Sequence, residues 1–218
     1  MKTDYISINK EAYNKLAKQY FERHKNIDSK NEMSNENWSL LFKRYRKNIN
    51  SSALEIGPGD GRILKILELC NFQTTAVEFS TEMMKYATLN SPTTLFLSKN
   101  VLDVNFEKEQ FEFIFASAVI HNFTKNDANL LLSLIYQWLH KNGILFLSTT
   151  IHEKSEEGFS KKEGYTGNVK RYRKKYTETE ILEVLQKKHF VILEKIYTNE
   201  RNRNKVWINI VCKKEDKI

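Results

Sequence analysis

The sequence predicts an α/β fold: a largely parallel sheet with helices on both of its faces. From residue 52 onward, short apolar runs rich in β-branched and aromatic residues alternate with helical patterns. A glycine-rich turn separates the first of these runs from the first helix that follows it. Strands that alternate with helices over such a length form a mostly parallel sheet, because each helix returns the chain to the same edge.

Before the sheet, residues 1–50 carry helical patterns and no strand signal. Apolar and aromatic residues recur there at helical spacing, namely Tyr13, Leu16, Ala17, Tyr20 and Phe21. A polar connection over residues 26–37 leads to a second helix, which begins at Trp38 and ends near Asn50. We expect these two helices to form a cap placed before the sheet.

Seven segments have the composition of strands: Ala53–Ile56, Thr74–Phe79, Thr94–Leu97, Phe111–Ala116, Ile144–Thr149, Val191–Tyr197 and Val206–Cys212. Four helices fit between them: Arg62–Leu69, Thr81–Leu89, Lys125–Leu139 and Thr177–Lys187. Only a polar loop, residues 198–205, joins the last two strands. These two strands should therefore pair as an antiparallel hairpin at the edge of the sheet.

The domain organisation follows from the length and from the absence of repeats or low-complexity segments. At 218 residues the chain fits a single domain, residues 1–218, with one core. We divide it into a helical cap (1–50), a ligand-binding core (51–150), an insertion on the substrate side (151–176) and the end of the sheet (177–218).

The composition is that of a globular protein with a basic surface. With 40% hydrophobic and 28% charged residues the chain can bury a core, and its net charge of +8 favours an anionic partner. Residues 1–11 are polar, and no apolar run reaches the roughly 18 residues of a membrane span. Cys70 and Cys212 lie in separate apolar runs, which indicates free thiols. We expect a cytoplasmic protein that contacts no membrane.

The five histidines are scattered along the chain, with none of the spacings of a zinc site, so we expect no metal.

The glycine turn, Glu55-Ile56-Gly57-Pro58-Gly59-Asp60-Gly61-Arg62, narrows the class of ligand. Its glycines allow positive φ and close approach of the backbone to a ligand. A dinucleotide site of the G-x-G-x-x-G type needs a third glycine where Arg62 stands, which argues against a nicotinamide-dependent dehydrogenase. An acid two residues before the first glycine would repel a pyrophosphate and suits a cationic ligand.

This Glu-x-Gly-x-Gly-x-Gly pattern resembles the first motif of the class I S-adenosylmethionine-dependent methyltransferases. The resemblance covers residues 50 to 150 well and the rest loosely. It implies a Rossmann-like seven-stranded sheet that ends in an antiparallel hairpin. It also implies S-adenosylmethionine as the cofactor and S-adenosylhomocysteine as the product. Glu55 would lie near the methionine amino end of the cofactor, and the turn with Gly57, Gly59 and Gly61 would lie beneath it.

Glu78 ends the second predicted strand and should face the glycine turn, since ligands of open α/β sheets bind at the carboxyl ends of strands. It follows Glu55 by 23 positions, close to the roughly 20-residue offset of an acid that binds ribose hydroxyls. The resemblance implies this role for Glu78 and places Phe79 and Met83 against the adenine. A surface glutamate at a strand end is the simpler alternative.

The stretch before the fourth strand resembles the family segment whose acid contacts the adenine amino group. Counting back from Phe111 puts that position on Asn100, with Val101 offering its backbone N–H. An amide oxygen accepts the same hydrogen bond as a carboxylate. Asp103 is the competing candidate.

The fourth strand runs into Ser117 and a turn that contains His121, where the family brings cofactor and acceptor together. The resemblance places Ser117 at the cofactor. His121 could orient the acceptor or take its proton, because the ordinary pKa of histidine lies near neutrality. It could equally pack beneath the cofactor without a catalytic role.

In the family that the chain resembles, the insertion over residues 151–176 shapes the acceptor pocket. The insertion interleaves basic and aromatic residues, of which Tyr165, Arg171 and Tyr172 are our candidates for contact with an anionic or aromatic substrate. The resemblance implies that Tyr13 and Tyr20 close over a bound cofactor, and we count them among the candidates for substrate contact. Burial in the core, or a merely solvated loop, would account for the same residues.

The sequence therefore predicts a methyltransferase that acts on an oxygen or nitrogen atom of a small molecule, mainly by proximity and orientation. A nucleic-acid methyltransferase is an alternative favoured by the basic charge. Against it, the fourth strand ends Ala116-Ser117-Ala118-Val119, unlike the endings of enzymes that methylate base amino groups. A cofactor-binding protein without turnover is the other alternative.

Overall fold

The computed structural model describes residues 4–25, 35–200 and 205–215. The helices are α1 (Tyr5–Lys25), α2 (Asn35–Tyr45), α3 (Arg62–Leu69), α4 (Thr81–Asn90), α5 (Lys125–Trp138) and α6 (Glu178–Lys187). The strands are β1 (Ser52–Ile56), β2 (Gln73–Val77), β3 (Leu95–Leu97), β4 (Phe111–Ser117), β5 (Leu139–Ile151), β6 (Glu156–Lys161), β7 (Lys170–Lys175), β8 (Phe190–Glu200) and β9 (Lys205–Lys214). Two 3₁₀ turns, η1 (Val101–Asp103) and η2 (Ile120–Asn122), follow β3 and β4.

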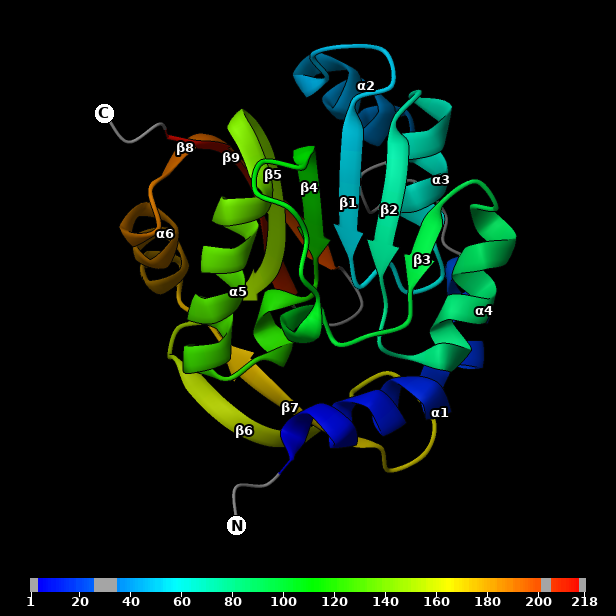
Figure 1. Cartoon of the computed structure of the whole chain (residues 1–218). Coiled ribbons are helices and arrows are strands. Elements are labelled where there is room, and N and C mark those ends of the chain that lie inside the picture. Colours follow the sequence, from blue (N-terminus) through cyan, green and yellow to red (C-terminus); the bar gives the residue numbers. More distant parts are fainter. Residues whose placement is uncertain (1–3, 26–34, 201–204, 216–218) are drawn as a thin grey trace.

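The main sheet has seven strands in the order β3-β2-β1-β4-β5-β9-β8, and β1 to β5 run parallel (Figure 1). Strand β9 is antiparallel to both β5 and β8, so the last two strands form the expected hairpin at the edge. The predicted fold class is confirmed. The strand order reverses between β1 and β4, and a ligand of such a sheet binds at the carboxyl ends beside that point.

Two apolar layers cover the faces of the sheet. On one face α2 and α3 bury an aromatic cluster in which Trp38 and Phe42 pack against Phe115 and Phe146. On the other face α5 and α6 bury aliphatic side chains such as Leu131 against the sheet. The prediction that both N-terminal helices cap the sheet is therefore wrong for α2, which forms part of the core because its apolar face matches the phenylalanines of the sheet.

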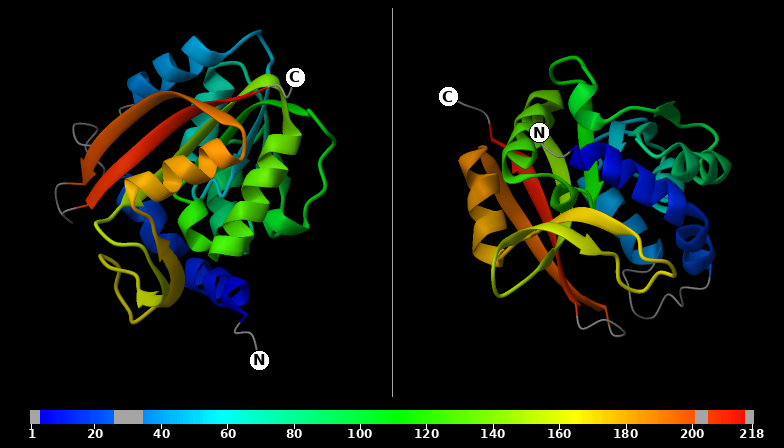
Figure 2. Two further views of the ribbon diagram at one scale, coloured as in Figure 1. Left: turned by 90° about the vertical axis from the view of Figure 1, so that its left-hand side faces the viewer. Right: turned by 90° about the horizontal axis from the view of Figure 1, so that it is seen from below.

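Helix α1 lies across the carboxyl ends of the parallel strands, where the arrowheads of β1, β2 and β4 point towards it (Figures 1 and 2). Beside it lies the pair β6–β7, an antiparallel two-stranded sheet within the predicted insertion, residues 151–176. Asn9, which is 1% exposed, ties the two together: its side chain accepts a hydrogen bond from the Tyr172 N–H at 2.7 Å and donates to the Tyr172 carbonyl at 3.3 Å.

Candidate active site

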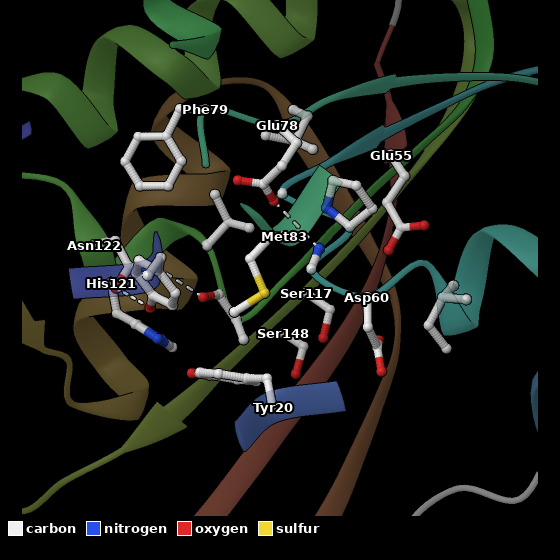
Figure 3. Close-up of a pocket in the computed structure, with 18 of the residues that line it drawn as sticks. Tyr20, Glu55, Asp60, Glu78, Phe79, Met83, Ser117, His121, Asn122 and Ser148 are labelled. Atoms are coloured by element: carbon white, nitrogen blue, oxygen red, sulfur yellow. Dashed lines mark hydrogen bonds between the residues drawn. The ribbon is translucent and has the colours of Figure 1, made fainter. Parts of the chain in front are cut away.

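A pocket lies between the carboxyl ends of the strands and helix α1 (Figure 3). Its volume is about 330 Å³, within the range of small-molecule sites. Most of the predicted site residues line it: Glu55, Gly57, Gly59, Glu78, Phe79, Met83, Asn100, Val101, Ser117, His121, Tyr13, Tyr20 and Tyr165. Three do not, namely Gly61, Arg171 and Tyr172.

The glycine turn links β1 to α3 with its three glycines at positive φ. Gly57 and Gly59 face the pocket. Gly61 faces away, since a Cβ built on it would lie 2.7 Å from the Cα of Ala87 in α4. The prediction of a cofactor contact for Gly61 is therefore replaced by a packing role: only glycine lets α4 approach the turn this closely.

Helix α3 begins directly after the turn, and no side chain caps it. The first N–H groups of a helix have no intrahelical partner and favour a negative charge nearby. In α3 the N–H of Leu64 is directed at the carboxylate of Glu55. In contrast, Ser80, Thr124 and Thr177 cap α4, α5 and α6 with their hydroxyl groups. Of these four helices, α3, which begins at the pocket, is the one whose N-cap residue makes no side-chain hydrogen bond.

Three carboxylates are buried along this side of the pocket: Glu55 (3% exposed), Asp60 (4%) and Glu78 (4%). The Oε2 atom of Glu55 has no hydrogen-bond partner. Burial, and next the negative charge of Asp60, raise the pKa of Glu55 well above its usual range, although Arg62 opposes the shift. A buried carboxylate with an unpaired oxygen favours a ligand that brings a positive charge.

Glu78 leaves β2 beside the glycine turn. Its Oε2 accepts a hydrogen bond from the Gly59 N–H at 3.3 Å, and its Oε1 accepts one from the Ser80 N–H at 2.8 Å. Burial raises the pKa of Glu78 to about 7, although these backbone donors lower it. The carboxylate is thus fixed in the pocket wall, and each of its oxygens can accept a further hydrogen bond.

Next to Glu78 the pocket becomes apolar. Met83, 1% exposed, and Phe79 form one wall, and the chain around Asn100 and Val101 forms another. The Asn100 side chain accepts a hydrogen bond from the Leu102 N–H at 3.3 Å and caps η1. Asp103, the competing candidate, is exposed and does not line the pocket.

The opposite end of the pocket is formed by η2 and the ends of β4, β5 and β9. His121 and Asn122 lie across the pocket from Glu55 and Asp60 (Figure 3). His121 is 3% exposed, with Nδ1 3.0 Å from Oγ1 of Thr149. Burial, then the positive charge of Arg173, lower the pKa of His121 well below its usual range. The imidazole is therefore neutral at neutral pH.

Aromatic side chains from α1 and from the segment between β6 and β7 close the pocket. Tyr20 stacks on Tyr165 with ring centroids 4.7 Å apart, and Tyr13 donates a hydrogen bond to Oδ1 of Asn122 at 3.0 Å. Lys162 extends over Tyr20, with its ammonium 4.8 Å from the ring centroid. The contacts of Tyr20 with Tyr165 and Lys162 join segments about 145 positions apart in the sequence.

Two of the predicted substrate residues do not line the pocket, because β7 is covered on both of its faces. Tyr172 packs between Tyr5 and Phe159, with ring centroids at 4.8 and 5.7 Å. Arg171 points to the other side, where its guanidinium donates a hydrogen bond to Oδ1 of Asn122 at 3.0 Å. Both side chains lie behind the pocket wall.

Sequence reasoning missed several residues that line the pocket. His24 pairs with Asp60 at 2.7 Å and so holds the end of α1 over the glycine turn. Lys162 was not singled out within the basic insertion, and Trp207 and Asn209 reach the pocket from β9. None of these residues lies in a recognisable local motif, and only the tertiary fold brings them together.

Residues 54–147 match the family described as a methyltransferase domain. This part of the chain is thus similar to methyltransferase domains. The match covers β1 to β5 and hence the strands whose ends form the cofactor side of the pocket. No curated protein matches the chain in sequence.

Several solved structures share the fold of this chain. The 1,6-didemethyltoxoflavin-N1-methyltransferase of Burkholderia thailandensis, solved with 1,6-didemethyltoxoflavin and S-adenosylhomocysteine, is 15% identical, with a TM-score of 0.78 over 99% of this chain and 91% of that one. A methyltransferase from Methanosarcina mazei is 16% identical, with a TM-score of 0.71 over 81% and 98% of the two chains. The [4+2]-cyclase SpnF is 13% identical, with a TM-score of 0.67 over 88% and 86%.

Within the part of the chain that the structure describes, no helix is long and apolar enough to cross a membrane. The same residues contain no group of three or more histidine, cysteine, aspartate or glutamate side chains placed to hold a metal ion.

Proposed function

We propose that the protein transfers the methyl group of S-adenosylmethionine to an oxygen or nitrogen atom of a small-molecule acceptor. The buried Oε2 of Glu55, which has no hydrogen-bond partner and lies beside the start of α3, carries this proposal. It fits a ligand with an ammonium group near the carboxylate and a carboxylate near the helix terminus, as the methionine part of the cofactor has.

The remaining contacts follow the length of the same cofactor. Glu78 would accept hydrogen bonds from both ribose hydroxyls, and Gly57 and Gly59 would let the cofactor lie against the turn. Phe79 and Met83 would pack on the adenine, with Asn100 and the Val101 N–H at its edge. Ser117 would lie near the sulfur at the end of β4.

When bound, S-adenosylmethionine supplies a methyl group on a sulfonium that needs no further activation. A lone pair of the acceptor would displace the sulfur from this carbon, and the electron pair of the broken carbon–sulfur bond would stay on sulfur. The chain has to hold acceptor and cofactor in line. His121, neutral and at the far end of the pocket, would take the proton of an acceptor atom that carries one.

Two further expectations belong to this proposal. The acceptor is a small molecule, since α1 and the β6–β7 segment cover the strand ends and enclose the pocket. We also place the protein in a reducing cytoplasm, where the buried free thiols of Cys70 and Cys212 stay reduced.

The test begins with calorimetric titration of S-adenosylmethionine, S-adenosylhomocysteine and NAD into the wild-type protein and into Glu78→Ala. We expect micromolar binding of the first two ligands, no binding of NAD, and about a hundredfold weaker binding in the variant, because a buried acceptor for two hydroxyls is lost. Glu107→Ala, an exposed carboxylate outside the pocket, is the matched control. Equal affinity in wild type and Glu78→Ala would refute the role of Glu78.

Turnover is tested separately, because SpnF, with the same fold, is described as a cyclase. Incubation with S-adenosylmethionine and mixed small-molecule extracts should release S-adenosylhomocysteine together with a product heavier by one methylene. Binding of the cofactor without any such product would support the alternative of a binding protein. Salt-sensitive binding of bulk tRNA would support the nucleic-acid alternative.

A further inference from the structure

Two side chains of the pocket bury a polar atom that has no hydrogen-bond partner within the part of the chain that the structure describes: Glu55, through Oε2, and Trp38, through Nε1. The other such side chains, Arg171, Tyr172 and Glu180, do not line the pocket. A buried polar atom without a partner costs free energy and is rare in folded proteins. The Glu55 oxygen can accept a hydrogen bond, whereas the Trp38 N–H can only donate one. The pocket therefore offers a ligand one buried acceptor and one buried donor.

The packing around Trp38 fixes the direction of its N–H. The side chain is 6% exposed, and its ring meets Phe115 and Phe146 edge-on, with centroids 5.4 and 5.0 Å apart. It also stacks on Phe42, with centroids 5.7 Å apart. An indole enclosed by three rings in a close-packed core cannot rotate to bring its nitrogen to another acceptor. An acceptor for this N–H can therefore be supplied by a ligand in the pocket.

Trp38 and Glu55 lie at the same corner of the pocket. Trp38 shares an apolar cluster with Ala53 and Ile63. Ala53 precedes Glu55 by two positions in β1, and alternate residues of a strand point to the same face, so Glu55 lies on the face of the sheet that α2 covers. Ile63 is the second residue of α3 and lines the pocket. The donor and the acceptor are thus both close to the start of α3.

Two hydroxyl groups lie on this face as well. Ser117 and Ser148 follow Phe115 and Phe146 by two positions in β4 and β5, so their side chains point to the side of the sheet on which Trp38 packs. They are register partners, they line the pocket, and Figure 3 shows them side by side. Their hydroxyl groups make the surroundings of the Trp38 N–H polar and able to donate further hydrogen bonds.

The amino-acid end of S-adenosylmethionine has both groups that this corner needs. Its ammonium group can donate to Oε2 of Glu55, and its carboxylate, on the same carbon atom, can accept from Trp38. A hydrogen bond to an ionised group is stronger than one between neutral groups, so a single indole N–H can have a measurable effect. The positive charge of Arg62, which lines the pocket and lowers the pKa of Glu55, favours the carboxylate at longer range.

We propose that Trp38 binds the carboxylate of S-adenosylmethionine through its indole N–H and thereby selects the cofactor that has a complete amino-acid end. This proposal rests on the proposed function and adds a residue that determines specificity for the cofactor. Trp38 lies in α2, before residues 54–147, so the part of the chain that matches the methyltransferase domain does not include it. Helix α2 then has a role in ligand binding besides its place in the core.

The test compares three ligands by calorimetry. S-adenosylhomocysteine carries the ammonium group and the carboxylate, 5′-(3-aminopropylthio)-5′-deoxyadenosine lacks only the carboxylate, and 5′-methylthioadenosine lacks both groups. The wild-type protein should bind the first about tenfold or more tightly than the second, because the carboxylate accepts a hydrogen bond from a buried donor. Equal affinity for these two ligands would overturn the proposal.

Trp38→Phe keeps an aromatic ring and every charge of the pocket but removes the N–H. It should weaken binding of S-adenosylhomocysteine about tenfold and leave binding of the aminopropyl compound within about twofold. This ratio does not depend on how much of the variant is folded. Trp138→Phe, the same change at a buried tryptophan outside the pocket, should leave the ratio as in the wild type. Equal losses for both ligands in Trp38→Phe, or no loss, would overturn the role of Trp38.

Glu55→Gln is the complementary variant. It should weaken binding of both ligands that carry the ammonium group and leave 5′-methylthioadenosine within about twofold; equal losses for all three would contradict the pairing of Glu55 with the ammonium group. Wild-type protein that binds neither S-adenosylmethionine nor S-adenosylhomocysteine would contradict the proposed function. Tight binding of both, without discrimination against the aminopropyl compound, would contradict only the role of Trp38.

Discussion

The cofactor end and the acceptor end of the pocket are built in different ways. The cofactor end comes from a continuous part of the chain, in which Glu55, Glu78 and Ser117 each stand at or just after the end of a parallel strand. The acceptor end combines α1, the segment after β6 and strand β9. The cofactor end thus forms from neighbouring strands and turns, whereas the acceptor end forms only when segments far apart in the sequence pack together.

Because different segments form the two ends, a substitution at one end should leave the function of the other unchanged. The largest expected effect is at the acceptor end. His121→Asn should lower kcat by about 10² to 10³ for an acceptor that loses a proton, because a positioned base contributes at that level. Affinity for S-adenosylhomocysteine should remain within about twofold.

His189→Asn, an exposed histidine at the end of α6, serves as the control. An unchanged kcat in His121→Asn, or a kcat that falls only as much as the folded fraction measured by circular dichroism, would show that the histidine is structural. The acceptor end would then contain no base.

Within the cofactor end, two glycines should respond in opposite ways. Gly61→Ala should lower the free energy of unfolding by roughly 2–4 kcal/mol, because positive φ and a clash with the Ala87 backbone act together. Gly59→Ala meets no atom within 4 Å, so only the positive φ opposes it, at about 1–2 kcal/mol. Its methyl group should instead weaken cofactor binding.

Thermal unfolding and calorimetry with S-adenosylhomocysteine measure the two effects separately. A Gly61→Ala variant that is as stable as Gly59→Ala would show that α4 does not pack on the turn as described.

The smallest expected effect is the dependence of cofactor affinity on pH. The pKa of Glu78 is raised to about 7, so its carboxylate is mostly protonated at pH 6 and mostly ionised at pH 8. Only the ionised form accepts hydrogen bonds from both hydroxyls, and affinity should therefore rise about tenfold over this interval. In Glu78→Gln this rise should disappear.

The contribution of Glu78 to folding stability changes with pH in the opposite direction to its contribution to cofactor affinity. Because the folded pKa lies above the ordinary value of 4.5, the folded protein binds more protons than the unfolded chain between about pH 4.5 and 7. The contribution of Glu78 to the stability of the ligand-free protein is therefore lost as pH rises through this window. Unfolding in urea at several pH values, with Glu78→Gln as the reference, measures that loss.

The same difference explains what the sequence could and could not predict. The order of strands, the glycine turn and the position of Glu78 follow from short-range patterns, and the structure has the predicted sheet. Gly61 was misassigned because its requirement for glycine comes from Ala87, a residue of another helix. Spacing within the turn cannot distinguish a glycine that faces a ligand from one that faces a helix.

Tertiary contacts also account for the errors outside the turn. A short basic strand such as β7 shows no alternation from which the buried sides of Arg171 and Tyr172 could be read. Helix α2 has the pattern of any amphipathic helix, and only the phenylalanines of the sheet place it in the core. The sequence does not distinguish Lys162 from the other lysines of the insertion, because its contacts with the tyrosines of α1 form only in the folded protein.

Helix α1 forms side-chain hydrogen bonds at both ends of the pocket. Near the cofactor end the Asn14 side chain accepts a hydrogen bond from the Ser80 hydroxyl at 2.7 Å, and His24 holds Asp60. Near the acceptor end Asn9 donates to the Asn122 carbonyl at 3.1 Å. A displacement of this helix would therefore open both ends of the pocket at once. We expect the steady-state turnover rate to be limited by how fast these hydrogen bonds of α1 break. A solvent of higher viscosity should therefore lower the steady-state rate and leave the single-turnover rate of methyl transfer unchanged.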